Sequence, residues 1–168
     1  MENGTPPIIA WGGFAVAIAG VLLTVYQAWR TQDHNKRSVR PLLQLRSDLS
    51  QGETAGLVLN NIGLGPAILV STEMTLDGKP IGGIDEDSVN RLRATLKTRP
   101  GASTFVPGEA IAKDATVILL GLSNYDKEKD VEFADLIRRR LKIEIVYKSL
   151  YGGKKFTANW PRPGKDDR

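Results

Sequence analysis

The sequence predicts an N-terminal transmembrane α-helix followed by a mainly-β domain, an antiparallel immunoglobulin-like β-sandwich with two short helical insertions. Three observations predict this fold class. An apolar run without a charged residue extends from Ile8 to Trp29. Beyond Pro41, short segments of alternating apolar and polar residues are separated by glycine and proline turns. Two further segments space their apolar residues as a helix does.

The apolar run Ile8–Trp29 is long enough to cross a bilayer. As a helix it reaches roughly 33 Å, against roughly 30 Å for a hydrocarbon core. No Lys or Arg precedes it, whereas several follow from Arg30 onward. Excess basic residues mark the cytoplasmic side. We therefore expect a single-pass protein of the bacterial inner membrane, in contact with the lipid bilayer, with its N-terminus outside and its C-terminal domain in the cytoplasm.

A cleaved signal peptide is the alternative for this run, because Ala17-Ile18-Ala19 resembles a small-x-small cleavage site. A signal peptide needs a basic segment at its start, and none is present. Cleavage there would also leave the apolar Val21–Tyr26 at a new N-terminus. We therefore favour a retained anchor.

Small and weakly polar residues of the run recur at steps of three and four, which places them on one stripe of a helix. Small residues let helix backbones approach closely in a membrane. The stripe therefore favours a homo-oligomer, although glycine and alanine are common in such helices and the alignment also arises by chance. The stripe consists of Ala10, Gly13, Ala17, Gly20, Thr24 and Gln27.

Composition changes divide the chain into five parts. We expect an extracytoplasmic tail over 1–7, the transmembrane helix over 8–29, a basic juxtamembrane stalk over 30–40, the β-sandwich over 41–160 and a disordered tail over 161–168.

The strands follow from period-two alternation between turn residues. Asp77-Gly78 is a strong signal for a tight hairpin. The predicted strands are Pro41–Arg46, Ala55–Asn60, Ala67–Leu76, Lys79–Ile81, Ser103–Val106, Thr116–Leu122, Leu141–Tyr147 and Phe156–Trp160.

The two helical insertions are predicted over Asp85–Lys97 and Asp126–Arg140. Each begins with acidic residues and ends with basic ones, which complements the helix dipole. That explanation is favoured over a metal site at Asp85 and Asp87 or an anion site at Arg138–Arg140.

The glycine-rich segment Asn60–Ala67 is not a nucleotide phosphate loop. Such a loop must open a helix, whereas here Pro66 is followed by a predicted strand. We expect a loop between strands, in which Gly63 and Gly65 adopt backbone angles that larger residues avoid.

No catalytic signature is present. The chain has no cysteine, its one histidine, His34, lies in the stalk, and Ser149 has no histidine partner in the domain. We therefore expect a protein that is not an enzyme, with no catalytic residues, metal or cofactor.

Several segments together resemble uncharacterised bacterial single-pass membrane proteins that pair an N-terminal anchor with a small C-terminal β-sandwich. The resemblance covers most of the chain and implies a fold and a location, with no catalytic residues. After the span and basic stalk, its segments are RPLLQL, LVLNNIGLGPAILVSTEMTLDGK, VPGE and IEIVYKSLYGGKKF.

Two functions remain open. The favoured one is a membrane-anchored interaction module, oligomeric through its helix, that presents the sandwich to an unidentified protein partner. The alternative is a ligand-gated membrane effector that binds a small anionic, nucleotide-like signal, as in bacterial antiphage defence. A net charge of +4 is too small to indicate duplex nucleic acid. A basic concavity on the folded domain would favour the alternative. The candidate anion-binding residues are Arg138, Arg139, Arg140, Lys142, Lys148, Lys154 and Lys155.

Overall fold

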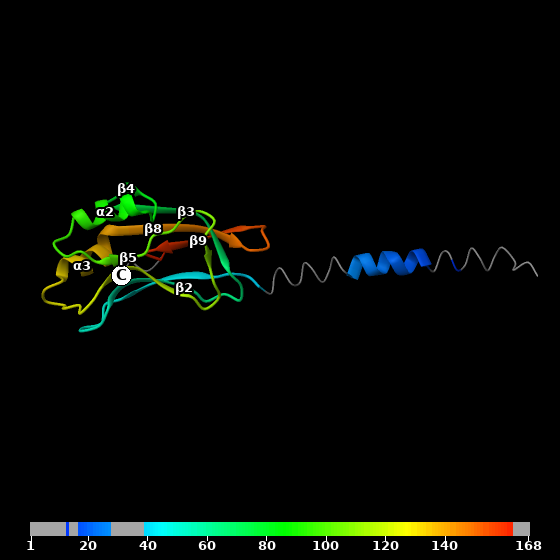
Figure 1. Cartoon of the computed structure of the whole chain (residues 1–168), viewed down its shortest axis with the longest axis horizontal. Helices are drawn as coiled ribbons and strands as arrows, with labels where there is room; N and C mark the ends of the chain where they lie inside the picture. The colour runs from blue at the N-terminus through cyan, green and yellow to red at the C-terminus, as the bar shows by residue number, and fades with distance from the viewer. Residues whose placement is uncertain (1–12, 14–16, 28–38, 163–168) are drawn as a thin grey trace, which may run out of the picture. The chain divides into compact units, whose positions relative to one another are not determined.

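The computed structural model describes residues 13, 17–27 and 39–162, and the chain divides into two units, Met1–Ser38 and Val39–Arg168 (Figure 1). In the first unit, Gly13 and residues 17–27 are helical. Within the described residues, no helix is both long and apolar enough to cross a membrane.

This finding contradicts the predicted transmembrane helix over 8–29. The single-pass topology and the inner-membrane location, with the N-terminus outside and the domain in the cytoplasm, were inferred from that helix and are contradicted with it. The tail 1–7, most of the stalk, with His34, and residues 163–168 lie outside the described residues.

The predicted stripe of small residues is described except for Ala10. Its other members are helical and exposed. Thr24 donates a hydrogen bond from Oγ1 to the carbonyl oxygen of Gly20, at 2.8 Å. A Cβ atom built at Gly13 or Gly20 meets nothing within 4 Å. A helix–helix interface along the stripe stays a prediction.

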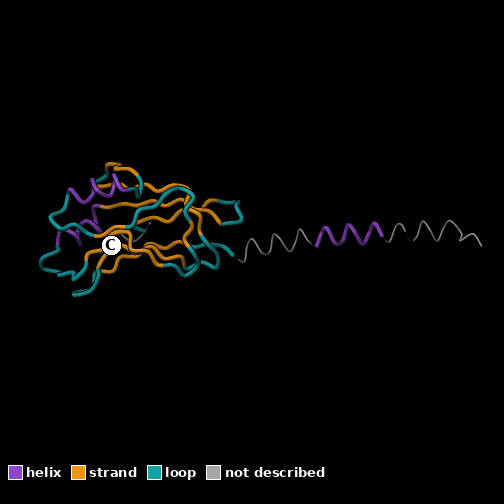
Figure 2. The backbone as a smooth tube through the Cα atoms, in the orientation of Figure 1, coloured by secondary structure: helices purple, strands orange, loops and turns teal. Residues whose placement is uncertain are grey.

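The second unit is mainly β and consists of two antiparallel sheets (Figures 1 and 2). The first sheet has the order β1 (Leu43–Asp48), β2 (Ala55–Asn61), β7 (Thr116–Leu122) and β5 (Gly101–Ala102). The second has the order β4 (Lys79–Gly82), β3 (Ala67–Leu76), β8 (Leu141–Ser149) and β9 (Lys155–Trp160), and β6 (Ala110–Ile111) also pairs with β3. β1 and β9 are therefore edge strands.

The hydrophobic core lies between the two sheets, and β8 contributes alternate residues to it. In β8, Ile143, Ile145 and Tyr147 are buried while Lys142 and Glu144 are exposed. The Tyr147 hydroxyl accepts a hydrogen bond from the backbone N–H of Leu43 at 3.2 Å. That bond joins β8 of one sheet to β1 of the other.

The helical segments are shorter than predicted, and three are assigned in the domain: α2 (Glu86–Ala94), α3 (Val131–Asp135) and the π-helix η1 (Leu136–Arg140). α2 begins after Asp85, whose Oδ1 accepts the N–H of Ser88 at 3.0 Å. This bond lowers the pKa of Asp85. Asp85 is therefore a helix cap.

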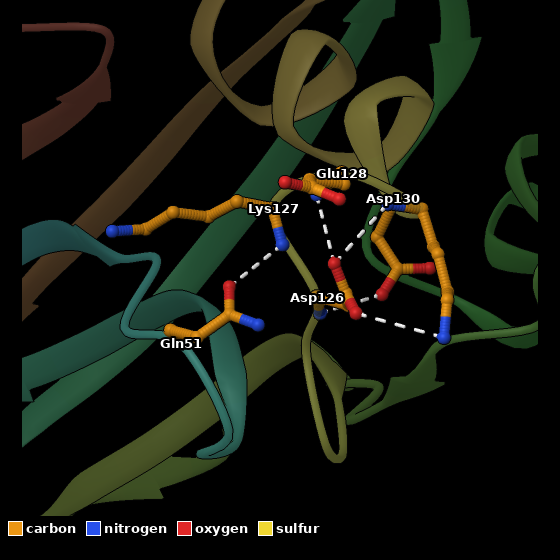
Figure 3. Close-up of polar contacts among 6 residues, drawn as sticks. Gln51, Asp126, Lys127, Glu128 and Asp130 are labelled. Atoms are coloured by element: carbon orange, nitrogen blue, oxygen red, sulfur yellow. Dashed lines mark hydrogen bonds and ion pairs between the residues drawn. The ribbon is translucent and has the colours of Figure 1, made fainter.

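Helix α3 begins five residues later than predicted because residues 126–130 form a hydrogen-bonded turn (Figure 3). Asp126 Oδ1 accepts the N–H of Glu128 at 2.8 Å, which lowers the pKa of Asp126. The N–H of Asp126 donates to Asp130 Oδ2 at 2.9 Å, and that of Lys127 donates to Gln51 Oε1 at 2.8 Å. These bonds satisfy the backbone in a form that is not helical.

Two details of the loops differ from expectation. The predicted strand Ser103–Val106 is absent, because Phe105 is buried and donates its N–H to Ile84, away from the sheet that contains β5. Gly63 and Gly65 do not have positive φ. They are required by close approach instead: a Cβ at Gly63 would overlap Leu42 N, and one at Gly65 would overlap Val39 O.

A basic groove beside strands β1 and β9

The candidate site is a hollow of about 530 Å³ on the second unit. It lies where edge strand β1 packs beside edge strand β9, next to the π-helix η1. We call it the arginine groove, because four of its lining residues are arginines. The lining consists of Leu45, Arg46, Ser47, Arg138, Arg139, Trp160, Pro161 and Arg162.

Local structure explains why the arginines face outward. Arg46 follows the buried Leu45 in β1 and takes the exposed position of the alternation. In η1, Leu136 and Ile137 are buried in the core, which leaves Arg138 and Arg139 exposed. Arg162 follows the last strand and is also exposed. Three separate segments of the chain thus supply the charge of one groove.

The groove is unbalanced in charge, since its lining contains no acidic residue. Arg139 lies 3.5 Å from Asp135 and is partly neutralised by it. Among the described residues, Arg46, Arg138 and Arg162 have no ion pair. Guanidinium groups bind carboxylates and phosphates through two parallel hydrogen bonds, so unpaired arginines in a groove favour an anion.

Trp160 provides an aromatic wall for the arginine groove. It lies opposite Ile143 of β8 and is partly buried. Its Nε1 donates a hydrogen bond to the carbonyl oxygen of Ile137 at 2.8 Å. The indole is therefore held in one orientation between β9 and η1.

A second hollow, of about 370 Å³, continues along the same pair of edge strands and shares Leu45 and Arg162 with the arginine groove. Asn159 lines it, and the buried Oδ1 atom of Asn159 accepts no hydrogen bond in the described structure. Ile62 and Thr157 also line this hollow.

Of the seven predicted anion-binding residues, only Arg138 and Arg139 line the groove. Arg140 donates from Nε and Nη2 to the two carboxylate oxygens of Asp77, at 2.9 and 2.7 Å. This bidentate bond lowers the pKa of Asp77 and raises that of Arg140. Lys142 is exposed on the outer face of β8.

The remaining three lysines lie toward the other end of the domain. Lys148 pairs with Lys155 at the hairpin end of the β8–β9 ladder, whereas Trp160 pairs with Ile143 at the opposite end. Five ladder steps separate these pairs, or roughly 17 Å at about 3.3 Å per residue. Lys154 precedes Lys155 in the hairpin. The predicted basic set therefore does not form one site.

Sequence reasoning missed Arg46, Arg162 and Trp160 as groove residues. Arg46 is one exposed residue of an ordinary strand, and nothing local marks it. Arg162 falls in the tail that was expected to be disordered, although Pro161 and Arg162 both line the groove. The tripeptide Trp160-Pro161-Arg162, which places an aromatic residue close to a cation, is a local signal that could have indicated the groove.

The described residues offer no group of three or more His, Cys, Asp or Glu side chains that could hold a metal. Ser149 is buried, and its Oγ accepts the N–H of Tyr151 at 3.4 Å.

Fold and site thus define a mainly-β domain with a basic surface groove at the edges of its two sheets. The chain belongs to the family described as a domain of unknown function, DUF8453, whose model matches residues 8–161. No curated protein matches the chain. The resemblance to bacterial single-pass proteins stays a prediction.

Proposed function

We propose that this protein is a non-catalytic binding module whose arginine groove takes up a small anionic ligand. The observation that carries the proposal is the convergence of Arg46, Arg138 and Arg162, without ion pairs among the described residues, on one groove without an acidic residue. A basic concavity is the feature that separates ligand binding from a module that only presents its sandwich to a protein.

Physical chemistry supports the choice of an anion. Like charges close together repel, so a cluster of arginines is stabilised when an anion neutralises it. A hydrogen bond to a charged group contributes about 1.5–3 kcal/mol, and several acting together retain a small ligand. The groove volume of about 530 Å³ falls within the range of roughly 300–1,000 Å³ for small-molecule sites.

The test is pyrophosphate binding to the full chain, measured by calorimetry and by thermal shift. We expect Arg138→Gln and Arg46→Gln each to weaken binding by tenfold or more, as the loss of a charged hydrogen bond of about 1.5–3 kcal/mol implies. Binding should also weaken as the salt concentration rises, because the groove is open to solvent.

Lys155→Gln is the matched control, since it removes one positive charge at the opposite end of the β8–β9 ladder. It should leave the dissociation constant nearly unchanged. Equal weakening by Lys155→Gln and Arg138→Gln would show that net charge alone attracts pyrophosphate. That result, or no binding by the parent chain, contradicts the proposal.

A further inference from the structure

The lining of the arginine groove is not purely cationic. Leu45, Trp160 and Pro161 contribute apolar surface among the four arginines. An inorganic anion uses only the charged part of such a site and leaves the aromatic wall in contact with water. This lining therefore suits a ligand that has both negative charge and an apolar, planar part.

Trp160 is suited to bind a planar ring. Its Nε1 bond to Ile137 and its partial burial hold the indole in place before a ligand arrives. Little side-chain freedom is then lost on binding, which favours affinity. Any nucleobase can stack on an aromatic side chain, because each base presents a π-face.

The number of arginines in the groove favours a ligand with more than one negative charge. Arg138 comes from η1, Arg46 from β1 and Arg162 from the residues after β9, so three separate segments of the chain bring cations to the groove that Trp160 also lines. A ligand with two or more phosphate charges engages more than one of them. A single carboxylate is matched by one guanidinium and leaves the other arginines unpaired.

We propose that the ligand of the arginine groove is a nucleotide, with its base stacked on Trp160 and its phosphates bound by Arg46, Arg138 and Arg162. This inference rests on the proposed function, because it names the chemical class of the anion. In this proposal, Trp160 makes the groove prefer a nucleotide over phosphate compounds that lack a base. The arginines supply affinity for every phosphate compound alike.

The experiment compares ADP with pyrophosphate as probes of the full chain. Trp160 serves as the reporter once the other two tryptophans are replaced, by Trp11→Phe and Trp29→Phe. We expect ADP to quench Trp160 emission and to bind about tenfold or more tightly than pyrophosphate. Excess pyrophosphate should reverse the quenching, because the two compounds share the arginines.

Variants of Trp160 isolate the stacking contact. By calorimetry, Trp160→Leu should abolish the preference of the chain for ADP over pyrophosphate. Trp160→Phe keeps an aromatic ring and should preserve part of the preference, even though the Nε1 bond is lost. Circular dichroism of both variants checks that the sheets are intact, and Trp160→Phe is the informative variant if Trp160→Leu does not fold.

The outcomes separate the two proposals. Equal affinity of the parent chain for ADP and pyrophosphate overturns the nucleotide inference and leaves anion binding in place. Binding of neither probe overturns both. The inference is also overturned if single-stranded oligonucleotides bind more tightly than ADP and their affinity rises with length. That result would assign the groove to a nucleic acid strand.

Discussion

At the scale of the residue, the buried side chain of Asn61 forms hydrogen bonds to backbone groups from three separate parts of the chain. It is 1% exposed. Its Nδ2 donates to the carbonyl oxygens of Gly65, Ile111 and Ala112 at 2.9–3.1 Å. Its Oδ1 accepts the N–H groups of Leu42 and Gly63, at 3.3 and 3.1 Å. One buried amide thus ties the β2–β3 loop to the start of β1 and to the end of β6.

We predict that Asn61→Leu lowers the free energy of unfolding by about 3 kcal/mol or more, because it leaves several buried backbone groups without partners. Urea denaturation followed by circular dichroism measures the loss. Asn60→Leu is the control, since the buried Oδ1 of Asn60 accepts no hydrogen bond in the described structure. Its cost should stay within about 1 kcal/mol. Equal losses for the two variants would contradict this role of Asn61.

At the scale of the element, an ion pair and a backbone hydrogen bond between Asp77 and Arg140 hold the β3–β4 hairpin to the end of η1. The turn residues Asp77 and Gly78 have φ values of 50° and 77°, which confirms the tight hairpin expected from the dipeptide. The carboxylate of Asp77 binds Arg140 through two hydrogen bonds, and the N–H of Asp77 donates to the carbonyl oxygen of Arg140 at 3.0 Å.

This pair predicts a pH dependence of stability. Because Arg140 lowers the pKa of Asp77 in the folded state, the pair stabilises the fold above the normal carboxyl pKa of about 4. The stabilisation is lost as pH falls through the lower, folded-state pKa. Arg140→Gln should therefore lower Tm at pH 7, and its difference from the parent chain should shrink from pH 5 toward pH 2.

Thermal melts across that range test the prediction. Lys142→Gln removes an exposed neighbouring cation that forms no ion pair among the described residues. Its effect on Tm should be small and should not follow the protonation of Asp77. A Tm difference for Arg140→Gln that stays constant down to pH 2 would argue against the ion pair as its cause.

At the scale of the whole molecule, the two sheets of the second unit share one core. Ile145 is fully buried in it, and Tyr147 crosses from β8 to bond with β1. We predict that Ile145→Asp abolishes cooperative unfolding and the β-sheet signal in circular dichroism, because an unpaired charge in this core is costly. Glu144→Gln, on the exposed neighbouring position, should fold as the parent chain does. A cooperative transition for Ile145→Asp would show that the sheets do not depend on one core.

The sequence alone determined most of the strands, the Asp77-Gly78 turn and the start of α2, because each depends on residues close together in the chain. Alternation defines a strand, two residues define the tight turn, and Asp85 reaches the N–H of Ser88 three residues later. Local pattern failed where distant contacts compete with it. The buried Phe105 draws the predicted strand Ser103–Val106 away from its sheet, and the apolar run 8–29 did not establish a membrane span.

Only the tertiary structure decided which basic residues form a site. Arg46, Arg138 and Arg162 are far apart in sequence, and they meet because edge strand β1 packs beside edge strand β9 next to η1. Arg140, adjacent to the groove residues in sequence, is bound instead by Asp77 on a hairpin 63 positions away. Strand order and register set these distances. Both arise from long-range packing of the core, which charge and spacing along the chain do not encode.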